Sequence, residues 1–286
     1  MSRLVHVNGR YVDESEATVS IFDRGFLFAD GVYEVTTVLG GKLVDFPGHM
    51  ARLRRSLREL DLAFEVDEPA LLDVHRRLVT ENGVVEGLVY LQVTRGAADR
   101  DFGFPDPAAV PPTLVLFTQE KTLIESPIAE RGLTVVFEPD LRWSRCDIKT
   151  VQLLYPALAK MAAKARGADD AWMVKDGLVT EGTSNNAHIV TKDGVLVTRD
   201  LSDAILHGIT RAAVLACARD EGIRIEERAF TPDEALSAAE AFVTSATTFV
   251  TAVVAIDGTP IGDGRPGPVA RALRAHYIAE SLKRAI

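Results

Sequence analysis

Four short dipeptides most constrain the fold of this chain, because each separates two strand-like segments. Such pairs readily adopt the backbone conformations of tight hairpin turns, so each one predicts two neighbouring antiparallel strands. Helical segments lie among these hairpins without a regular strand–helix–strand alternation. The sequence therefore predicts an α+β fold rather than a doubly wound parallel sheet. The four turns are Asn8-Gly9, Gly40-Gly41, Asp176-Gly177 and Asp257-Gly258.

The helical segments are marked by apolar residues that recur every three or four positions. One of them follows Lys149 and carries Leu154, Leu158 and Met161 at this spacing. Pro156 fits its first turn, and Gly167 supplies a stop. The same spacing predicts further helices over about 49–60, 68–82, 210–221 and 269–285, and a shorter one within 231–239.

The length of 286 residues is enough for two domains. We expect an N-terminal α+β domain at 1–118, a linker at 119–124 and a C-terminal domain at 125–286. Within the first domain, the Pro-rich segment 97–112 is longer than a simple connection between strands requires. Its length makes this loop a candidate for a functional role.

Charge and composition exclude several classes of protein. A net charge of −9 argues against non-specific binding to nucleic acid or to anionic membranes, because both need a basic face. No apolar stretch is long enough to span a bilayer, and no secretory signal is visible. The two cysteines, Cys146 and Cys217, lie far apart and fit a reducing compartment. We expect a cytoplasmic protein without nucleic-acid or membrane partners.

Several kinds of catalytic site lack their sequence signature. The six histidines show no spacing typical of metal ligands, so no metal site is expected. A G-x-S-x-G nucleophile motif and a G-x-x-x-x-G-K-[ST] phosphate loop are both absent from the sequence. Metal-dependent catalysis, serine hydrolysis and nucleotide hydrolysis by a P-loop are therefore not favoured.

Three weak signals together indicate pyridoxal phosphate (PLP). Lys149, flanked by Ile148 and Val151, suits a lysine that loses its proton readily, although a solvated loop lysine is an alternative. Gly208-Ile209-Thr210 opens a helix and suits an anion, although Thr210 can equally be a simple N-cap. Glu181 stands where a strand enters a turn and is either a solvated charge or a partner for a protonated ring nitrogen. An amine, an anion site and a carboxylate are the three groups that PLP requires.

Six motifs then carry a resemblance that covers nearly the whole chain. The sequence resembles the fold type IV PLP enzymes, which comprise D-amino-acid transaminases, branched-chain aminotransferases and aminodeoxychorismate lyases. The resemblance implies a two-domain α+β fold and an aminotransferase that uses PLP. The motifs are DRGFLFADGVYEV (23–35), GHMARL (48–53), RCDIKT (145–150), VTEGTSNN (179–186), LHGITR (206–211) and VTSATT (243–248).

The resemblance also implies roles for individual residues. Lys149 would be the covalent anchor of PLP and would move protons in catalysis, and Glu181 would pair with the ring nitrogen. Arg52 would bind the phosphate, a role that its place on an apparently solvated helix face does not suggest. The remaining cofactor residues would be Ile209, Thr210 and Thr247 at the phosphate and Leu206 against the ring.

The closest resemblance, to D-amino-acid transaminases, implies Tyr33, Arg100, Phe102 and His49 as substrate-binding residues. Those enzymes carry Arg-x-His in the long loop, whereas this chain has Arg100-Asp101-Phe102. A D-amino acid such as D-alanine or D-glutamate would pass its amine to pyruvate or 2-oxoglutarate. The substitution keeps an (R)-selective amine transaminase open, as well as a branched-chain aminotransferase or a lyase. A silent family member that only binds ligands is a further alternative, and a homodimer is expected.

Overall fold

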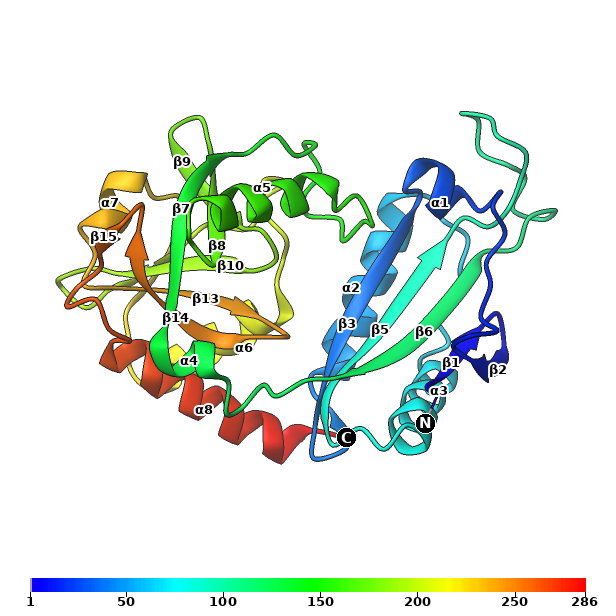
Figure 1. The fold of residues 1–286 in the computed structure, drawn as a ribbon, viewed down its shortest axis with the longest axis horizontal. Coiled ribbons are helices and arrows are strands. Elements are labelled where there is room, and N and C mark those ends of the chain that lie inside the picture. The colour runs from blue at the N-terminus through cyan, green and yellow to red at the C-terminus, as the bar shows by residue number, and fades with distance from the viewer. Residues whose placement is uncertain (1) are drawn as a thin grey trace. The chain divides into compact units, whose positions relative to one another are not determined.

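The computed structural model describes residues 2–286 and divides into two compact units, each built around one β-sheet (Figure 1). The first unit comprises residues up to Thr122, Ile148–Gln152 and Ser281–Ile286. The second comprises Leu123–Asp147 and Leu153–Glu280. Helices and mostly antiparallel strands alternate irregularly in both units, which confirms the predicted α+β class.

The first unit holds a fully antiparallel six-stranded sheet in the order β2-β1-β6-β5-β3-β4. The Asn8-Gly9 and Gly40-Gly41 turns join β1 to β2 and β3 to β4, as the dipeptides predict. Its elements are β1 (Leu4–Val7), β2 (Arg10–Asp13), α1 (Arg24–Phe28), β3 (Gly31–Leu39), β4 (Lys42–Leu43), α2 (Phe46–Glu59), α3 (Glu68–Glu81), β5 (Glu86–Thr94) and β6 (Thr113–Glu120).

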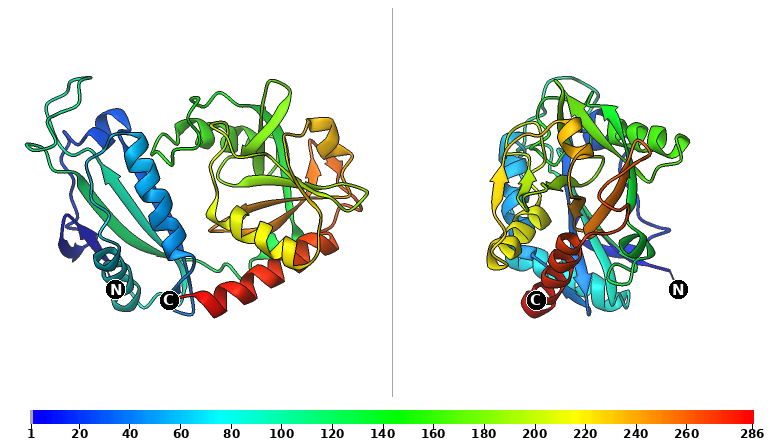
Figure 2. Two further views of the ribbon diagram at one scale, coloured as in Figure 1. Left: turned by 180° about the vertical axis from the view of Figure 1, so that it is seen from behind. Right: turned by 90° about the vertical axis from the view of Figure 1, so that its left-hand side faces the viewer.

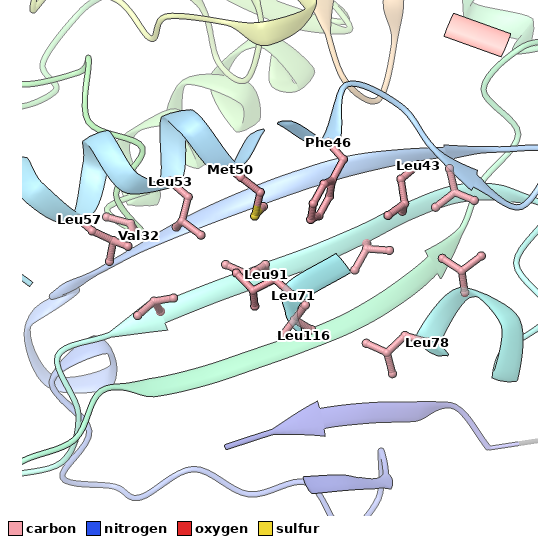
Figure 3. Packing of buried hydrophobic residues seen from close by; sticks show 14 of the residues in the cluster. Val32, Leu43, Phe46, Met50, Leu53, Leu57, Leu71, Leu78, Leu91 and Leu116 are labelled. Atoms are coloured by element: carbon pink, nitrogen blue, oxygen red, sulfur yellow. The ribbon is translucent and has the colours of Figure 1, made fainter. Parts of the chain in front are cut away.

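Helices α2 and α3 supply the core of this unit. Phe46, Met50, Leu53 and Leu57 repeat at helical spacing along α2 and are buried against the sheet (Figure 3). Leu71 and Leu78 of α3, with Leu91 and Leu116 of the sheet, belong to the same cluster. This packing fixes α2, the helix that carries His49 and Arg52.

The second unit holds a mixed sheet in the order β12-β11-β10-β13-β14-β7-β8-β9, with β15 paired to β14. Figure 2 shows it from behind, with α6 in yellow and α8 in orange to red. Its elements are α4 (Pro127–Arg131), β7 (Leu133–Pro139), α5 (Leu154–Ala165), β8 (Asp170–Lys175), β9 (Leu178–Gly182), β10 (Asn186–Val190), β11 (Leu196–Thr198), α6 (Ile209–Asp220), β12 (Ile225–Glu227), α7 (Pro232–Leu236), β13 (Glu240–Ser245), β14 (Phe249–Ile256), β15 (Thr259–Pro260) and α8 (Pro268–Arg284).

The sequence predicts the long helices well but misses two short ones. Helices α2, α3, α5, α6 and α8 all lie where the apolar spacing places them. Helices α1 and α4, of five residues each, are too short to display that spacing.

Helix α5 is confirmed, but its apolar stripe faces outward. Leu154, Leu158 and Met161 are 75%, 57% and 59% exposed. The residues that α5 buries are instead the small ones, Pro156, Ala159 and Ala163. The spacing of apolar residues identifies the helix, but it does not show which face of the helix is buried within the unit.

The segment around Lys149 belongs to the first unit, although the sequence predicts it within the C-terminal domain. The reason is backbone pairing with β3. Tyr33 N donates to Lys149 O at 3.0 Å, and Val151 N donates to Gly31 O at 3.1 Å. Among residues 2–286, no helix is long and apolar enough to cross a membrane.

Candidate functional site

Lys149 lies against β3 of the first unit, beside Tyr33. Its Nζ is 4.1 Å from the centre of the Tyr33 ring, and its backbone N donates to Ser56 Oγ at 3.3 Å. Its side chain is half-buried, and no carboxylate in the described part of the chain forms an ion pair with it. Tyr33 stacks on Tyr90, with ring centres 5.5 Å apart. The Lys149 side chain therefore lies over an aromatic ring that a second ring supports.

Arg52 is buried in a network with Glu34 and His49 rather than solvated. Its Nε donates to one Glu34 oxygen at 2.8 Å and its Nη2 to the other at 2.7 Å. His49 Nδ1 lies 2.7 Å from the same carboxylate. Burial alone raises the pKa of Glu34, but the charge of Arg52 and the hydrogen bonds from Arg52 and His49 outweigh it and hold that pKa at about 2. Glu34 is therefore a fixed anion that orients Arg52.

The long loop after β5 is anchored by a second buried arginine, Arg24. Its Nε donates to Asp30 at 2.8 Å, and its Nη1 donates to the backbone O of Asp101 at 2.7 Å. The loop residues Arg100 and Phe102 remain exposed and meet at the ring of Phe28. Arg100 and Phe102 are therefore exposed on a loop whose backbone is bound by the buried side chain of Arg24.

In the second unit, Glu181 at the end of β9 is the centre of a buried hydrogen-bond network. Arg142 Nη1 donates to Glu181 Oε1 at 2.5 Å, and Leu206 N donates to the same oxygen at 3.0 Å. Asn186 Nδ2 donates to Glu181 Oε2 at 2.9 Å. Asp140 accepts from Arg142 Nη2 at 2.7 Å. The carboxylate is therefore held in one orientation by three donors.

Burial and ion pairing have opposite effects on the pKa of Glu181. Burial raises the pKa of its carboxyl above the ordinary value, and Arg142 and the N–H of Leu206 work against that rise. A second cationic donor next to Glu181 would favour the charged form further. A protonated ring nitrogen is such a donor.

The N-terminus of helix α6 lies close to this network. Helix α6 begins at Ile209 after Gly208, and within residues 2–286 no side chain caps its first turn. The N–H groups there are therefore available, at the positive end of the helix dipole. A Cβ on Gly208 would lie 2.1 Å from Asn186 Oδ1, so a side chain has no room here. Thr210 is buried and does not act as the N-cap that the sequence allowed.

The turn after β13 carries further hydroxyl groups in this unit. Strand β13 pairs Thr244 with Asn186 of β10, and the turn that follows carries Thr247. Ser245 Oγ lies 2.8 Å from Thr248 Oγ1 and 3.4 Å from Thr247 Oγ1. The pairing with Asn186 thus ties this turn to the network around Glu181.

A family model for class IV aminotransferases matches residues 31–256. The chain belongs to the class IV aminotransferases. This aminotransferase is 40% identical over 282 residues to the D-alanine aminotransferase of Bacillus licheniformis, covering 96% of this chain and 98% of that protein. It is also 40% identical to the D-alanine aminotransferase of Staphylococcus haemolyticus, covering 96% of each.

The fold agrees with the family. The T.th. branched-chain amino acid aminotransferase, solved with pyridoxamine 5'-phosphate, matches with a TM-score of 0.89 and 27% identity. The match covers 99% of this chain and 95% of that one. The predicted family and fold type are therefore confirmed.

The expected site residues of the aminotransferase fall in both units. Lys149, Tyr33, Arg52, His49, Arg100 and Phe102 lie in the first, and Glu181, Leu206, Ile209, Thr210 and Thr247 lie in the second.

Sequence reasoning missed Glu34, Arg142 and Asn186. Arg142 is 39 residues from Glu181, and Glu34 is 18 residues from Arg52. In the sequence Asn186 is only the last residue of the motif VTEGTSNN, and nothing in its spacing indicates a partner. These pairs form only when the sheets assemble.

Proposed function

We propose that this chain is a PLP-dependent aminotransferase that exchanges the amine of a D-amino acid, such as D-alanine or D-glutamate, with a 2-oxo acid such as pyruvate or 2-oxoglutarate. The structural observation that carries the proposal is the buried Glu181 carboxylate with its three donors. The near-full-length similarity to two D-alanine aminotransferases supports the choice of a D-amino acid.

The residues present fit PLP in three places. Glu181 offers an oriented carboxylate for the ring nitrogen, and Asn186 and Arg142 keep it from turning. The free N–H groups at the start of α6, with the hydroxyl of Thr247, suit a phosphate. In our assignment Arg52, oriented by Glu34, contributes its charge to the phosphate, and Leu206 packs on the ring.

The chain's own groups would then perform the chemistry. When bound, PLP acts as an electron sink that makes the Cα proton of the substrate acidic. Lys149 would hold the cofactor until substrate arrives, and its amine would then act as the base and acid that move the proton at the substrate Cα. Glu181 would keep the ring nitrogen of the cofactor protonated.

Arg100 and Tyr33 are the proposed partners of the substrate carboxylate, with Phe102 as an apolar wall. Phe102 is 80% exposed on its loop and offers no polar group that a substrate must satisfy. This feature favours a second activity, in which (R)-amines with an apolar substituent are accepted slowly. His49 is only 2% exposed and contacts Glu34, so we propose that it supports Arg52 and does not bind substrate, although the resemblance implies a substrate-binding role.

We also propose a cytoplasmic homodimer. The outward stripe of α5, Leu154, Leu158 and Met161, is an apolar surface that monomeric proteins rarely leave uncovered. Phe22 and Phe26, before and within α1, are 50% and 77% exposed and add a second such surface. Cys146 and Cys217 do not form a disulfide, which is compatible with the cytoplasm. Light scattering that finds an active monomer would contradict the homodimer.

One experiment tests the anchor and the cofactor together. The purified holoprotein is expected to be yellow and, after borohydride reduction and peptide mapping, to carry the cofactor on Lys149. A Lys149→Ala variant is the control and should be colourless after dialysis. A label on Lys160 or Lys164 would refute the assignment of Lys149. Turnover of L-alanine in preference to D-alanine would refute the proposed stereochemistry.

A further inference from the structure

The turn between β13 and β14 ends on a phenylalanine in an unfavourable backbone conformation. Phe249 has a φ of 56°, in the left-handed region where a bulky residue is strained and glycine is usual. Strain of this kind persists only where the surroundings impose it, and it concentrates at functional sites. The neighbours of Phe249 must therefore hold it in this conformation.

Helix α8 supplies the groups that hold it. The Phe249 ring is fully buried and packs against Tyr277, with ring centres 5.5 Å apart. Arg274 Nη1 donates to the backbone O of Thr248 at 2.8 Å and of Val250 at 2.9 Å. These are the two carbonyls on either side of Phe249. Arg274 therefore fixes the backbone on both sides of the strained residue.

A second segment of the chain also binds the side chain of Arg274. Its Nη2 donates to the backbone O of Leu123 at 2.5 Å and of Ile124 at 3.1 Å. The planar guanidinium is thus held by four carbonyls in two segments of the same unit. A lysine in its place could not bridge both segments, because its ammonium lacks the fork geometry.

Arg274 and Phe249 hold the turn between β13 and β14, and this turn carries the hydroxyls of the candidate phosphate site. Ser245 Oγ receives the backbone N–H of Thr247 at 3.3 Å and contacts Thr248 Oγ1 at 2.8 Å. Thr251 Oγ1 donates to Thr248 O at 2.8 Å, on the same carbonyl that Arg274 binds. The positions of the Thr247 and Ser245 hydroxyls therefore depend on the backbone that Arg274 and Phe249 impose.

We propose that Phe249 and Arg274 are positioning residues that pre-organise this turn to bind the cofactor phosphate. The inference rests on the proposed function, because it assigns the phosphate to this turn. Donors that are already in place bind an anion without the entropic cost of ordering a loop. Neither residue contacts the phosphate in this proposal, since both act through the turn.

The test compares two ligands that differ only by the phosphate. Apoprotein of the full chain is titrated with PLP and with pyridoxal, which lacks the phosphate, and the two dissociation constants are measured. In Arg274→Lys the dissociation constant for PLP should rise about tenfold, which corresponds to about 1.4 kcal/mol, and that for pyridoxal should change less than about twofold. Arg271→Lys is the matched control, since Arg271 is exposed one turn earlier on α8, and both constants should stay unchanged.

An equal rise in the dissociation constants for PLP and pyridoxal, or no change in either constant, would refute the proposed role of Arg274 and Phe249. A measurement on the unmodified chain covers the case in which Arg274→Lys does not fold. Amide hydrogen exchange at residues 246–249 of the apoprotein should already be slow, and inorganic phosphate should slow it little further. Protection that arises only on adding phosphate would show that the turn is not pre-organised. If the unmodified chain binds no PLP, the proposed function fails and the inference fails with it.

Discussion

Replacing Glu34 by glutamine should destabilise the first unit by about 3 kcal/mol at neutral pH. The substitution keeps the size of the side chain but removes the charge that Arg52 and His49 face. Glu34 is completely buried, and Arg52 is 8% exposed, so neither partner can turn to water instead.

The magnitude follows from the pKa of Glu34. Lowering this pKa from 4.5 to about 2 means that the folded chain stabilises the carboxylate by about 3 kcal/mol, at about 1.4 kcal/mol for each pKa unit. Breaking a buried ion pair by removing one partner typically costs about 3–5 kcal/mol, which agrees. This is a large part of the roughly 5–15 kcal/mol that stabilises most proteins.

The effect should also depend on pH in a defined direction. Because folding lowers the pKa of this acid, the stabilisation is fully present above about pH 4.5 and is lost as the pH falls toward 2. The difference in stability between the wild-type chain and Glu34→Gln should therefore be constant near neutral pH and should narrow in acid.

Equilibrium urea unfolding of the apoprotein, followed by far-UV circular dichroism, measures the effect. Tryptophan fluorescence alone does not suffice, because Trp143 and Trp172 both lie in the second unit. Glu14→Gln is the control, since Glu14 also binds one arginine with both oxygens, but at an exposed site, and should cost less than about 1 kcal/mol. Equal effects of the two substitutions, or a difference that keeps its neutral-pH size at pH 2, would refute the reasoning.

Three further predictions concern activity and assembly. Glu181→Gln should retain the cofactor but lower kcat by roughly 100-fold, the effect of losing a pre-organised electrostatic contact, and wild-type turnover would show that another group holds the ring nitrogen. Arg100→Ala should lower kcat/KM for D-alanine by roughly 10- to 100-fold and spare an (R)-arylalkylamine, and Phe102→His should favour the amino acid. Unchanged D-alanine kinetics in Arg100→Ala would place the carboxylate elsewhere. Met161→Glu should shift the proposed dimer toward monomer in sedimentation velocity, and an unchanged dimer would exclude α5 from the interface.

The sequence by itself determined the local structure of this protein. Asn8-Gly9 and Asp176-Gly177 predict hairpin turns correctly because their backbone preferences depend on the two residues themselves. The spacing of apolar residues locates the long helices for the same reason. Contiguous motifs around Lys149 and Glu181 were sufficient to identify the family, since each motif is read without knowledge of the fold.

Only the tertiary structure decided which distant residues become partners. Arg52 looks like one of several arginines on a polar helix face until β3 brings Glu34 beside it. The Lys149 segment joins the first unit because its backbone pairs with β3, and no local pattern contains that pairing. Arg142 meets Glu181, and Arg274 meets Phe249, across separate elements. Burial and ion pairing are properties of the assembled chain, because they depend on which segments exclude water from one another.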